Sequence, residues 1–332
     1  MSAHDESMLP VVRAADLADT APDARWLIES LWARAGVGIL GGAPKCCKSW
    51  LALDVALSVA SGTPCLDTFR VVEPGDVLLY MAEDATDVVR QRLDSISRHR
   101  DLQLSSLPIY VITAPSVRLD LDLDRRRLDR TLDARRPRLL VLDPFVRLHR
   151  IRENDAGEVS AVLAYLRELQ RRYAMAVLVV HHARKNGVSE AHAGQGLRGS
   201  GDFFAWADSL LYLQRQRDGL RLSVEHRAAA APEPRLLHLD AEMPERAHLR
   251  LRESVSASET TAPLEPRVDL AACILAALDH AGRPLTRNEI RSVVRVRNQR
   301  LGVVLTELLA ASAITRDGDR WLRSPVPVPP SP

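Results

Sequence analysis

The feature that most constrains the fold is a short loop, rich in glycine and lysine, that follows an apolar run. Residues 37–40 lead into this loop, and a helical pattern begins at its end. Strand, loop and helix in this order are typical of a phosphate-binding loop, whose backbone N–H groups and helix N-terminus face phosphate oxygens. The residues expected to bind a nucleotide are Gly42, Ala43, Pro44, Lys45, Cys46, Cys47, Lys48, Ser49 and Trp50.

Two side chains of this loop carry the expected chemistry. Lys48 is predicted to neutralise charge between the β and γ phosphates of ATP, and the Ser49 hydroxyl to ligate Mg²⁺. Lysine is otherwise almost absent, because only three of the 45 basic residues are Lys and two of those lie in this loop. A planar guanidinium cannot replace a compact ammonium between phosphate oxygens. We therefore expect Lys48 to be a catalytic residue.

Cys47 stands where the pattern G-x-x-x-x-G-K-[ST] has its second glycine. Glycine is usual there because it permits close approach of the backbone and an unrestricted φ. Cysteine is small, so nucleotide binding is expected to survive. Beside Lys48 and a helix N-terminus we expect the thiol to ionise readily; the alternative is a thiol buried against the following helix and inert.

The chain beyond the loop alternates between apolar runs and amphipathic helical patterns. Apolar residues make up 46% of the sequence and aromatic residues only 4%, so the core is expected to be aliphatic, as in buried parallel strands. This alternation predicts an α/β fold with a mostly parallel sheet covered on both faces. Strands are expected at 37–40, 76–81, 108–112, 139–142 and 176–180, helices at 49–61, 85–98, 122–134 and 157–172, and an antiparallel extension at 209–214, 219–225 and 235–239.

Acidic residues follow two of the predicted strands. Asp143 ends one apolar run, where it is placed to hold a Mg²⁺-bound water beside Ser49. Glu83 ends another and is a candidate catalytic carboxylate that orients the attacking water. The alternative for either is an ordinary strand-terminal carboxylate that caps the next helix. Asp84 is expected to be such a cap.

These motifs, together with Val179-Val180-His181-His182-Ala183-Arg184-Lys185 and Leu197-Arg198-Gly199-Ser200-Gly201, resemble the RecA-like ATPases of the plasmid RepA hexameric helicase type. The DnaB-type replicative helicases are a more distant resemblance. The likeness covers about residues 25–240, with the motifs in the expected order. It implies a RecA-like P-loop NTPase core that binds ATP and Mg²⁺ and assembles into a homo-oligomeric, hexameric ring.

The resemblance also implies roles for residues outside the phosphate loop. His182 matches the polar sensor of the γ-phosphate, whereas His181 is expected to be a core histidine. The segment after Lys185 resembles the mobile loop that faces single-stranded DNA. Where the RepA-type pattern has its intersubunit arginine, this chain has Asp208, so Arg227, which matches the DnaB-type arginine, is the preferred catalytic candidate; a solvated arginine is the alternative.

Composition divides the chain into a loose arm at 1–24, the ATPase domain at 25–252, a linker at 253–266, a smaller domain at 267–323 and a disordered tail at 324–332. Three predicted helices and a hairpin are the outline of a winged helix. Its ten Arg against six acidic residues point to contacts with DNA, although protein docking is an equal alternative. The basic residues of the expected recognition helix are Arg295, Arg297 and Arg300.

Other functional classes are disfavoured. The sequence has no signal peptide and no apolar stretch long enough for a membrane, so a cytoplasmic protein is expected. Its four cysteines show neither disulfide nor metal-ligand spacing, which argues against a structural zinc site. The leading hypothesis is a ring-forming ATPase motor acting on single-stranded DNA in plasmid or mobile-element replication, with replication proteins as partners. The rival is an ATP-switched regulatory or binding module.

Overall fold

The computed structural model describes residues 11–17, 22–150, 156–182, 202–216, 219–252, 270–294, 298–311 and 313–324. The chain divides into two compact units, Met1–Ser254 and Val255–Pro332.

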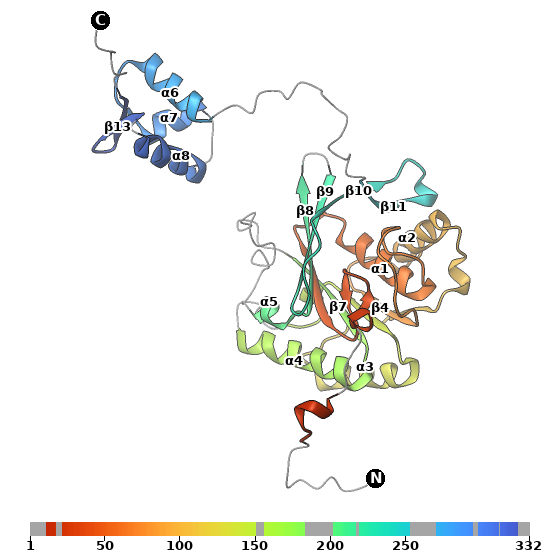
Figure 1. Ribbon diagram of the computed structural model, residues 1–332. Coiled ribbons are helices and arrows are strands. Elements are labelled where there is room, and N and C mark those ends of the chain that lie inside the picture. Colours follow the sequence, from red (N-terminus) through yellow and green to blue (C-terminus); the bar gives the residue numbers. More distant parts are fainter. Residues whose placement is uncertain are drawn as a thin grey trace, which may run out of the picture. The chain divides into compact units, whose positions relative to one another are not determined.

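The first unit is built on a nine-stranded sheet of order β11-β10-β9-β8-β3-β7-β6-β4-β5 (Figure 1). The six strands from β8 to β5 run parallel, and β9, β10 and β11 add antiparallel at one end. The mostly parallel sheet predicted from the sequence is therefore confirmed. The strands are β3 (Val37–Gly42), β4 (Val77–Met81), β5 (Ile109–Val111), β6 (Leu139–Asp143), β7 (Ala176–His182), β8 (Ser209–Gln216), β9 (Gly219–His226), β10 (Arg235–Asp240) and β11 (His248–Leu251).

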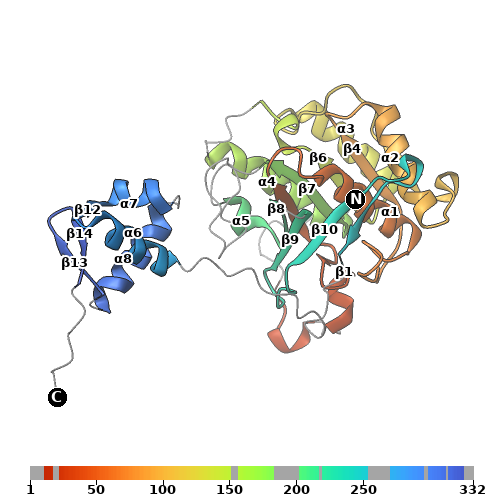
Figure 2. The same ribbon diagram turned by 90° about the horizontal axis from the view of Figure 1, so that it is seen from above.

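Helices cover both faces of this sheet (Figures 1 and 2). On one face, helices α1 (Lys48–Ser61) and α2 (Thr86–His99) pack on alternate strand residues such as Leu79 and Val141. The residues between them, such as Leu78 and Leu140, face the opposite side with α3 (Asp122–Arg135) and α4 (Ala156–Tyr173). Successive side chains of a strand point to opposite faces of the sheet, so each continuous apolar run contributes to both aliphatic cores.

A hairpin, a short helix and an edge strand of this unit were not predicted from the sequence. A short hairpin, β1 (Trp26–Ile28) and β2 (Trp32–Ala33), precedes the sheet and buries Trp32 completely. A five-residue helix, α5 (Asp202–Trp206), leads into β8, and β11 closes the antiparallel edge.

The second unit contains three helices and a small sheet. Its order is α6 (Leu270–Ala281), β12 (Leu285–Thr286), α7 (Arg287–Val294), α8 (Asn298–Ala310), β13 (Ile314–Asp317) and β14 (Arg320–Arg323), with β14 between β12 and β13. Its small core centres on Ile274, Ile290, Leu305 and Trp321.

The start of α7 shows how sequence fixes one boundary of this unit. The Glu289 carboxylate accepts from the Thr286 backbone N–H at 2.7 Å, and the Glu289 N–H donates to the Thr286 hydroxyl at 3.3 Å. This reciprocal pair is the capping box that the sequence pattern predicts. Its hydrogen bonds hold the pKa of Glu289 at about 2.

Among the described residues, no helix is both long and apolar enough to span a membrane.

Candidate nucleotide-binding site

The phosphate loop joins the buried end of β3 to the first residue of α1. Lys48 opens the helix and is only 6% exposed. Its ammonium turns back into the loop, donating to the Ala43 carbonyl at 2.8 Å and the Gly42 carbonyl at 3.1 Å. The loop thus encloses a fixed positive charge at the N-terminus of a 14-residue helix, an arrangement suited to anions.

The loop backbone is strained at two non-glycine residues. Lys45 has a φ of 61° and Cys47 a φ of 60°, both in the left-handed region. Gly42, with a φ of 151°, is required for a different reason: a Cβ there would lie 2.4 Å from the Leu213 carbonyl oxygen and 2.8 Å from Cys46 Sγ. The left-handed conformation of Cys47 explains why glycine is usual at its position.

Both cysteines of the loop are shielded from solvent, and for Cys47 this differs from the prediction. Cys46 is buried and donates from Sγ to the Ala43 carbonyl at 2.8 Å. Burial raises the pKa of the Cys47 thiol, outweighing the attraction of Arg215, Arg92 and Lys48, and burial likewise raises the pKa of Cys46. The expectation of a readily ionised Cys47 was therefore wrong, because loss of solvent around the thiol exceeds the effect of the neighbouring cations.

A carboxylate and a hydroxyl meet beside the loop. Asp143, the last residue of β6, accepts a hydrogen bond from the Ser49 side chain and is 6% exposed. Burial raises its pKa to about 6; the Ser49 hydrogen bond and Lys48 oppose this, while the negative charges of Asp84 and Glu83 add to it. Within the described part of the chain, Asp143 Oδ2 is buried with no hydrogen-bond partner. Such a carboxylate beside a hydroxyl fits a hydrated Mg²⁺, which neutralises charge and takes oxygen ligands.

Glu83 lies at the same edge, two residues after β4. Its Oε1 accepts from Arg147 Nε at 2.8 Å, and both side chains are about half exposed. The Ala82 N–H donates to the Asp143 carbonyl at 2.7 Å, which ties the segment carrying Glu83 to the end of β6. The carboxylate is thus held by a cation yet open to solvent.

Asp84 is not the expected helix cap. The N-cap of α2 is Ala85, which makes no side-chain capping bond, and Asp84 instead forms an ion pair with Arg92 at 2.5 Å. The Arg92 guanidinium lies over the ring of the half-buried Trp50, 5.6 Å from its centroid. An acidic residue after β4 is thereby linked through α2 to the first turn of α1, a three-residue contact that sequence spacing does not reveal.

The two histidines at the end of β7 have different environments. His181 is 1% exposed and stacks on Phe203 with ring centroids 4.4 Å apart, so it is a core residue as expected. His182 is partly exposed and lies opposite Gly42 in the register of the parallel β3–β7 pair. Its position beside the phosphate loop suits the predicted sensor role.

Four predicted residues therefore lie at the ends of four neighbouring strands. Gly42 ends β3, His182 ends β7 and Asp143 ends β6, while Glu83 follows β4, and these strands are adjacent in the order β3-β7-β6-β4. The carboxyl edge of a parallel sheet is where such folds bind ligands.

Arg227 does not lie with these four residues at the carboxyl edge of the sheet. It follows β9, whose last residue pairs with Ser209 at the start of β8, and so it lies at the edge of the sheet opposite the phosphate loop. Its Nε is 3.4 Å from Asp208 Oδ1, and its guanidinium also donates to the Ala205 carbonyl. Arg227 cannot reach the nucleotide site of its own chain.

A different arginine does reach the loop. Arg215, near the end of β8, donates to the Lys45 carbonyl at 2.6 Å and acts electrostatically on both loop cysteines. Its contact with the loop depends on the parallel pairing of β8 with β3, which sequence spacing does not reveal.

Several predicted segments lie outside the described residues. They include the stretch 183–201, with Lys185 and the Arg-Gly-Ser motif, and Arg295 and Arg297 of the smaller unit.

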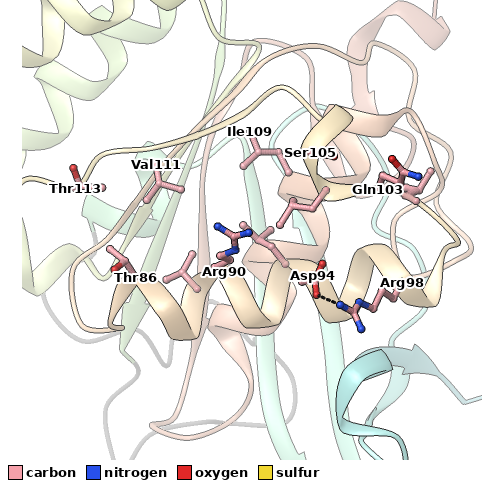
Figure 3. Close-up of a pocket in the computed structure, with 13 residues that line it drawn as sticks. Thr86, Arg90, Asp94, Arg98, Gln103, Ser105, Ile109, Val111 and Thr113 are labelled. Carbon is pink, nitrogen blue, oxygen red and sulfur yellow. Dashed lines mark ion pairs between the residues drawn. The ribbon is translucent and has the colours of Figure 1, made fainter.

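A groove of about 700 Å³ lies between α2 and the edge strand β5 (Figure 3). Ile109 and Val111 of β5 form part of its wall, and Asp94 and Arg98 pair at 2.8 Å along α2. None of its lining residues belongs to the phosphate loop, and neither Glu83 nor Asp143 lines it. The cavity is therefore separate from the nucleotide site.

Comparisons with solved structures find proteins of similar fold. A DnaB-like replicative helicase, solved with its interactions with primase, is similar in structure with a TM-score of 0.50 and 15% identity; the match covers 65% of this chain and 59% of the helicase. The RadB recombinase matches with a TM-score of 0.48 and 17% identity over 66% of this chain and 92% of that protein. No curated protein sequence matches.

The match to the DnaB-like helicase shows a likeness of fold, and the chain spans only 59% of the length of that helicase. The family described as "AAA domain" matches residues 3–188, more than half of the sequence, and includes the phosphate loop, Glu83, Asp143 and His182. The chain belongs to the AAA domain family.

Proposed function

We propose that this protein hydrolyses ATP in a Mg²⁺-dependent reaction. The observation that carries the proposal is the contact between the Ser49 hydroxyl and the buried Asp143 carboxylate, directly beside the loop that encloses Lys48. A buried carboxylate whose pKa is raised to about 6 gains from a divalent cation at neutral pH. Mg²⁺ would supply charge neutralisation on the phosphate oxygens.

The chain's own residues divide the remaining work. The loop N–H groups and Lys48 bind and orient the phosphates. Ser49 and Asp143 hold the metal, and His182 contacts the γ-phosphate from the neighbouring strand. Glu83, positioned by Arg147, orients the attacking water and accepts its proton. Catalysis then comes mainly from position and electrostatics.

The energy of hydrolysis is proposed to drive a ring-shaped motor on single-stranded DNA, in plasmid or mobile-element replication. The DnaB-like fold supports this use. The position of Arg227 supports assembly, because an arginine at the opposite sheet edge is available to a neighbouring copy and not to its own site. In enzymes where an arginine of this kind acts on the nucleotide of a neighbouring protein, it raises the rate of hydrolysis by about 10³–10⁵-fold.

A rival use is favoured by the second unit. Its order of helices and strands, with β14 between β12 and β13, supports a winged helix. In this alternative the winged helix binds DNA or a protein partner, and ATP only switches the assembly. Arg295, Arg297 and Arg300 would then be the primary contacts.

Two measurements test these proposals. ATP turnover by the purified chain, with and without Mg²⁺ and single-stranded DNA, tests the ATPase; no turnover under any condition would overturn it. Mass measurement with ATP and DNA, combined with a strand-displacement assay, separates the two uses. A ring that displaces strands supports the motor, whereas loss of all DNA binding on deletion of residues 267–332 supports the switch.

A further inference from the structure

Three potential metal ligands from distant parts of the chain converge at the far end of α1 and α2. They are Asp67, in the turn after α1, His99, the last residue of α2, and His248, the first residue of β11. One ligand atom from each lies within 4.8 Å of the others. Figures 1 and 2 show β11 beside α2, away from the strand ends that carry the nucleotide site.

His248 is oriented as a metal ligand. It is only 6% exposed, and its Nδ1 lies 2.9 Å from the Arg246 carbonyl. A carbonyl only accepts, so Nδ1 carries the proton and Nε2 has the lone pair. Within the described part of the chain, this buried Nε2 has no hydrogen-bond partner. A histidine whose other nitrogen donates to a carbonyl is the usual arrangement around a metal.

His99 and Asp67 complete the cluster from its solvent side. His99 Nε2 lies 2.9 Å from Asp67 Oδ2, and the two side chains are 26% and 44% exposed. The His99 and His248 rings are stacked, with centroids 3.3 Å apart. Two protonated imidazoles in this arrangement would repel each other, whereas a cation shared by two neutral rings and a carboxylate would be attracted. The rings must tilt apart for both lone pairs to converge on one ion.

The turn that carries Asp67 is fixed by the core. The Leu66 N–H donates to the buried Asp54 at 2.9 Å, and Cys65 and Phe69 exchange backbone hydrogen bonds across the turn. Arg100 pairs with Asp54 at 2.7 Å, and its Nε lies 3.6 Å from Asp67 Oδ1. This leaves Asp67 Oδ2 facing His99, so the carboxylate is held in place and only the two imidazole rings have to move.

We propose that Asp67, His99 and His248 bind one divalent transition-metal ion of the Zn²⁺ class. Two imidazoles and one carboxylate suit Zn²⁺, whereas Mg²⁺ and Ca²⁺ favour oxygen ligands. The ion would join β11 to the end of α2 and to the turn after α1. Its role is structural, because the site lies apart from the phosphate loop.

Titration of the full-length, tag-free protein with Co²⁺ tests the site, because the visible spectrum of this ion reports its ligands. We expect one equivalent to bind to wild type and to be displaced by Zn²⁺. His99→Gln and Asp67→Asn, both at the solvent side, are expected to weaken binding by roughly 100-fold or more, since loss of an outer-shell partner alone costs about 10–100-fold. Asp101→Asn is the control, because Asp101 pairs with Arg246 at 3.0 Å but is not a proposed ligand. We expect this variant to bind Co²⁺ with the affinity of wild type.

A second readout does not depend on spectroscopy. Zn²⁺ should raise the melting temperature of wild type and of Asp101→Asn, in a concentration-dependent way, and should leave His99→Gln unchanged. Equal shifts in all variants would place the metal elsewhere and overturn the proposal. So would an absence of Co²⁺ binding to wild type, or a spectrum dominated by thiolate ligands.

Discussion

Arg147 Nε donates to Glu83 Oε1 at 2.8 Å and so joins the segment after β6 to the segment after β4. Both side chains are about half exposed, and an ion pair of that kind adds little to stability. Its value is positional, because it fixes one oxygen of a carboxylate at the strand edge where Ser49 and Asp143 meet. If Glu83 orients the attacking water as proposed, Arg147 is a positioning residue, a role that no motif in the sequence indicates.

Replacing Arg147 with alanine should lower kcat for ATP hydrolysis by roughly tenfold or more, with little change in KM, because Glu83 loses its orientation while the phosphate loop is untouched. Arg147→Lys should recover part of the loss. Arg138→Ala is a matched control, since Arg138 forms a comparable ion pair with Glu73 at 3.0 Å away from these strand ends. A rise in KM alone would contradict the positioning role.

Lys48→Ala and Glu83→Gln should separate binding from chemistry. Without the ammonium the loop loses its fixed charge, so nucleotide binding and turnover are both expected to disappear. Glu83→Gln keeps the loop intact, so it should bind ATP normally and turn over roughly 10²-fold or more slowly. Binding of a fluorescent ATP analogue, with steady-state turnover, measures both effects. Wild-type turnover in Glu83→Gln would remove this residue from the mechanism.

Asp143 should make the stability of the nucleotide-free protein depend on pH. Its folded-state pKa of about 6 exceeds the ordinary 3.8, so its stabilising contribution is complete below pH 3.8 and is lost as pH rises through 6. The difference amounts to roughly 3 kcal/mol. Asp143→Asn cannot ionise, so it should be more stable than wild type at pH 8, and this advantage should shrink toward pH 5. Urea unfolding at both pH values measures it.

Added Mg-ATP provides the control for this pH effect. A divalent cation beside Asp143 favours the carboxylate, so saturating Mg-ATP should stabilise wild type at pH 8 more than it stabilises Asp143→Asn. A stability difference between the two proteins that does not vary with pH would show that Asp143 is not the titrating group.

The sheet, and the placement of the candidate site residues at one edge of it, could largely be predicted from the sequence, because both follow from local patterns. The aliphatic run of β6 specifies a buried strand and delivers Asp143 to its end, and glycine and lysine in the loop identify the phosphate site. The register of parallel strands then brings Gly42 opposite His182. Each of these steps uses neighbours in sequence or the shared polarity of parallel strands.

What sequence could not supply depends on long-range packing. The desolvation that raises the pKa of Cys47 arises from side chains that surround it only after folding. The absence of metal-ligand spacing argued against a zinc site, yet Asp67, His99 and His248 converge because β11 packs against α2. Asp84 was expected to cap helix α2, but it forms an ion pair with Arg92 instead.

Cys47→Gly should keep ATP binding and be as stable as wild type or more so. A left-handed conformation costs a non-glycine residue about 1–2 kcal/mol, and glycine removes that cost while giving up the packing of one half-buried thiol. Cys47→Ala keeps the strained φ of 60° and should be the less stable variant. Urea unfolding of wild type and the two variants gives the order of their free energies of unfolding. A higher free energy of unfolding for Cys47→Ala than for Cys47→Gly would contradict the prediction.

The thiol itself should react slowly with alkylating reagents at neutral pH, because burial raises its pKa. The alkylation rate of Cys47, compared with that of free cysteine at pH 7 and pH 9, measures this. A fast reaction at pH 7 would show that Cys47 ionises readily after all.

Arg227 should act on the nucleotide of a neighbouring copy, since it lies at the sheet edge opposite its own phosphate loop. Arg227→Ala should therefore bind ATP normally and lose most of its turnover, and Lys48→Ala should be inactive because its own site cannot bind. In a mixture, a Lys48→Ala subunit still offers Arg227 to the intact site of an Arg227→Ala subunit.

We expect mixed assemblies of these two variants to have a higher turnover than either variant alone. A mixture of Lys48→Ala with the Lys48→Ala/Arg227→Ala double variant should remain inactive. If mixtures of the single variants stay inactive while mass measurement shows that they co-assemble, Arg227 is not the shared residue. The same experiment with Arg215→Ala then tests the arginine that contacts the loop of its own chain, for which no rescue by a neighbour is expected.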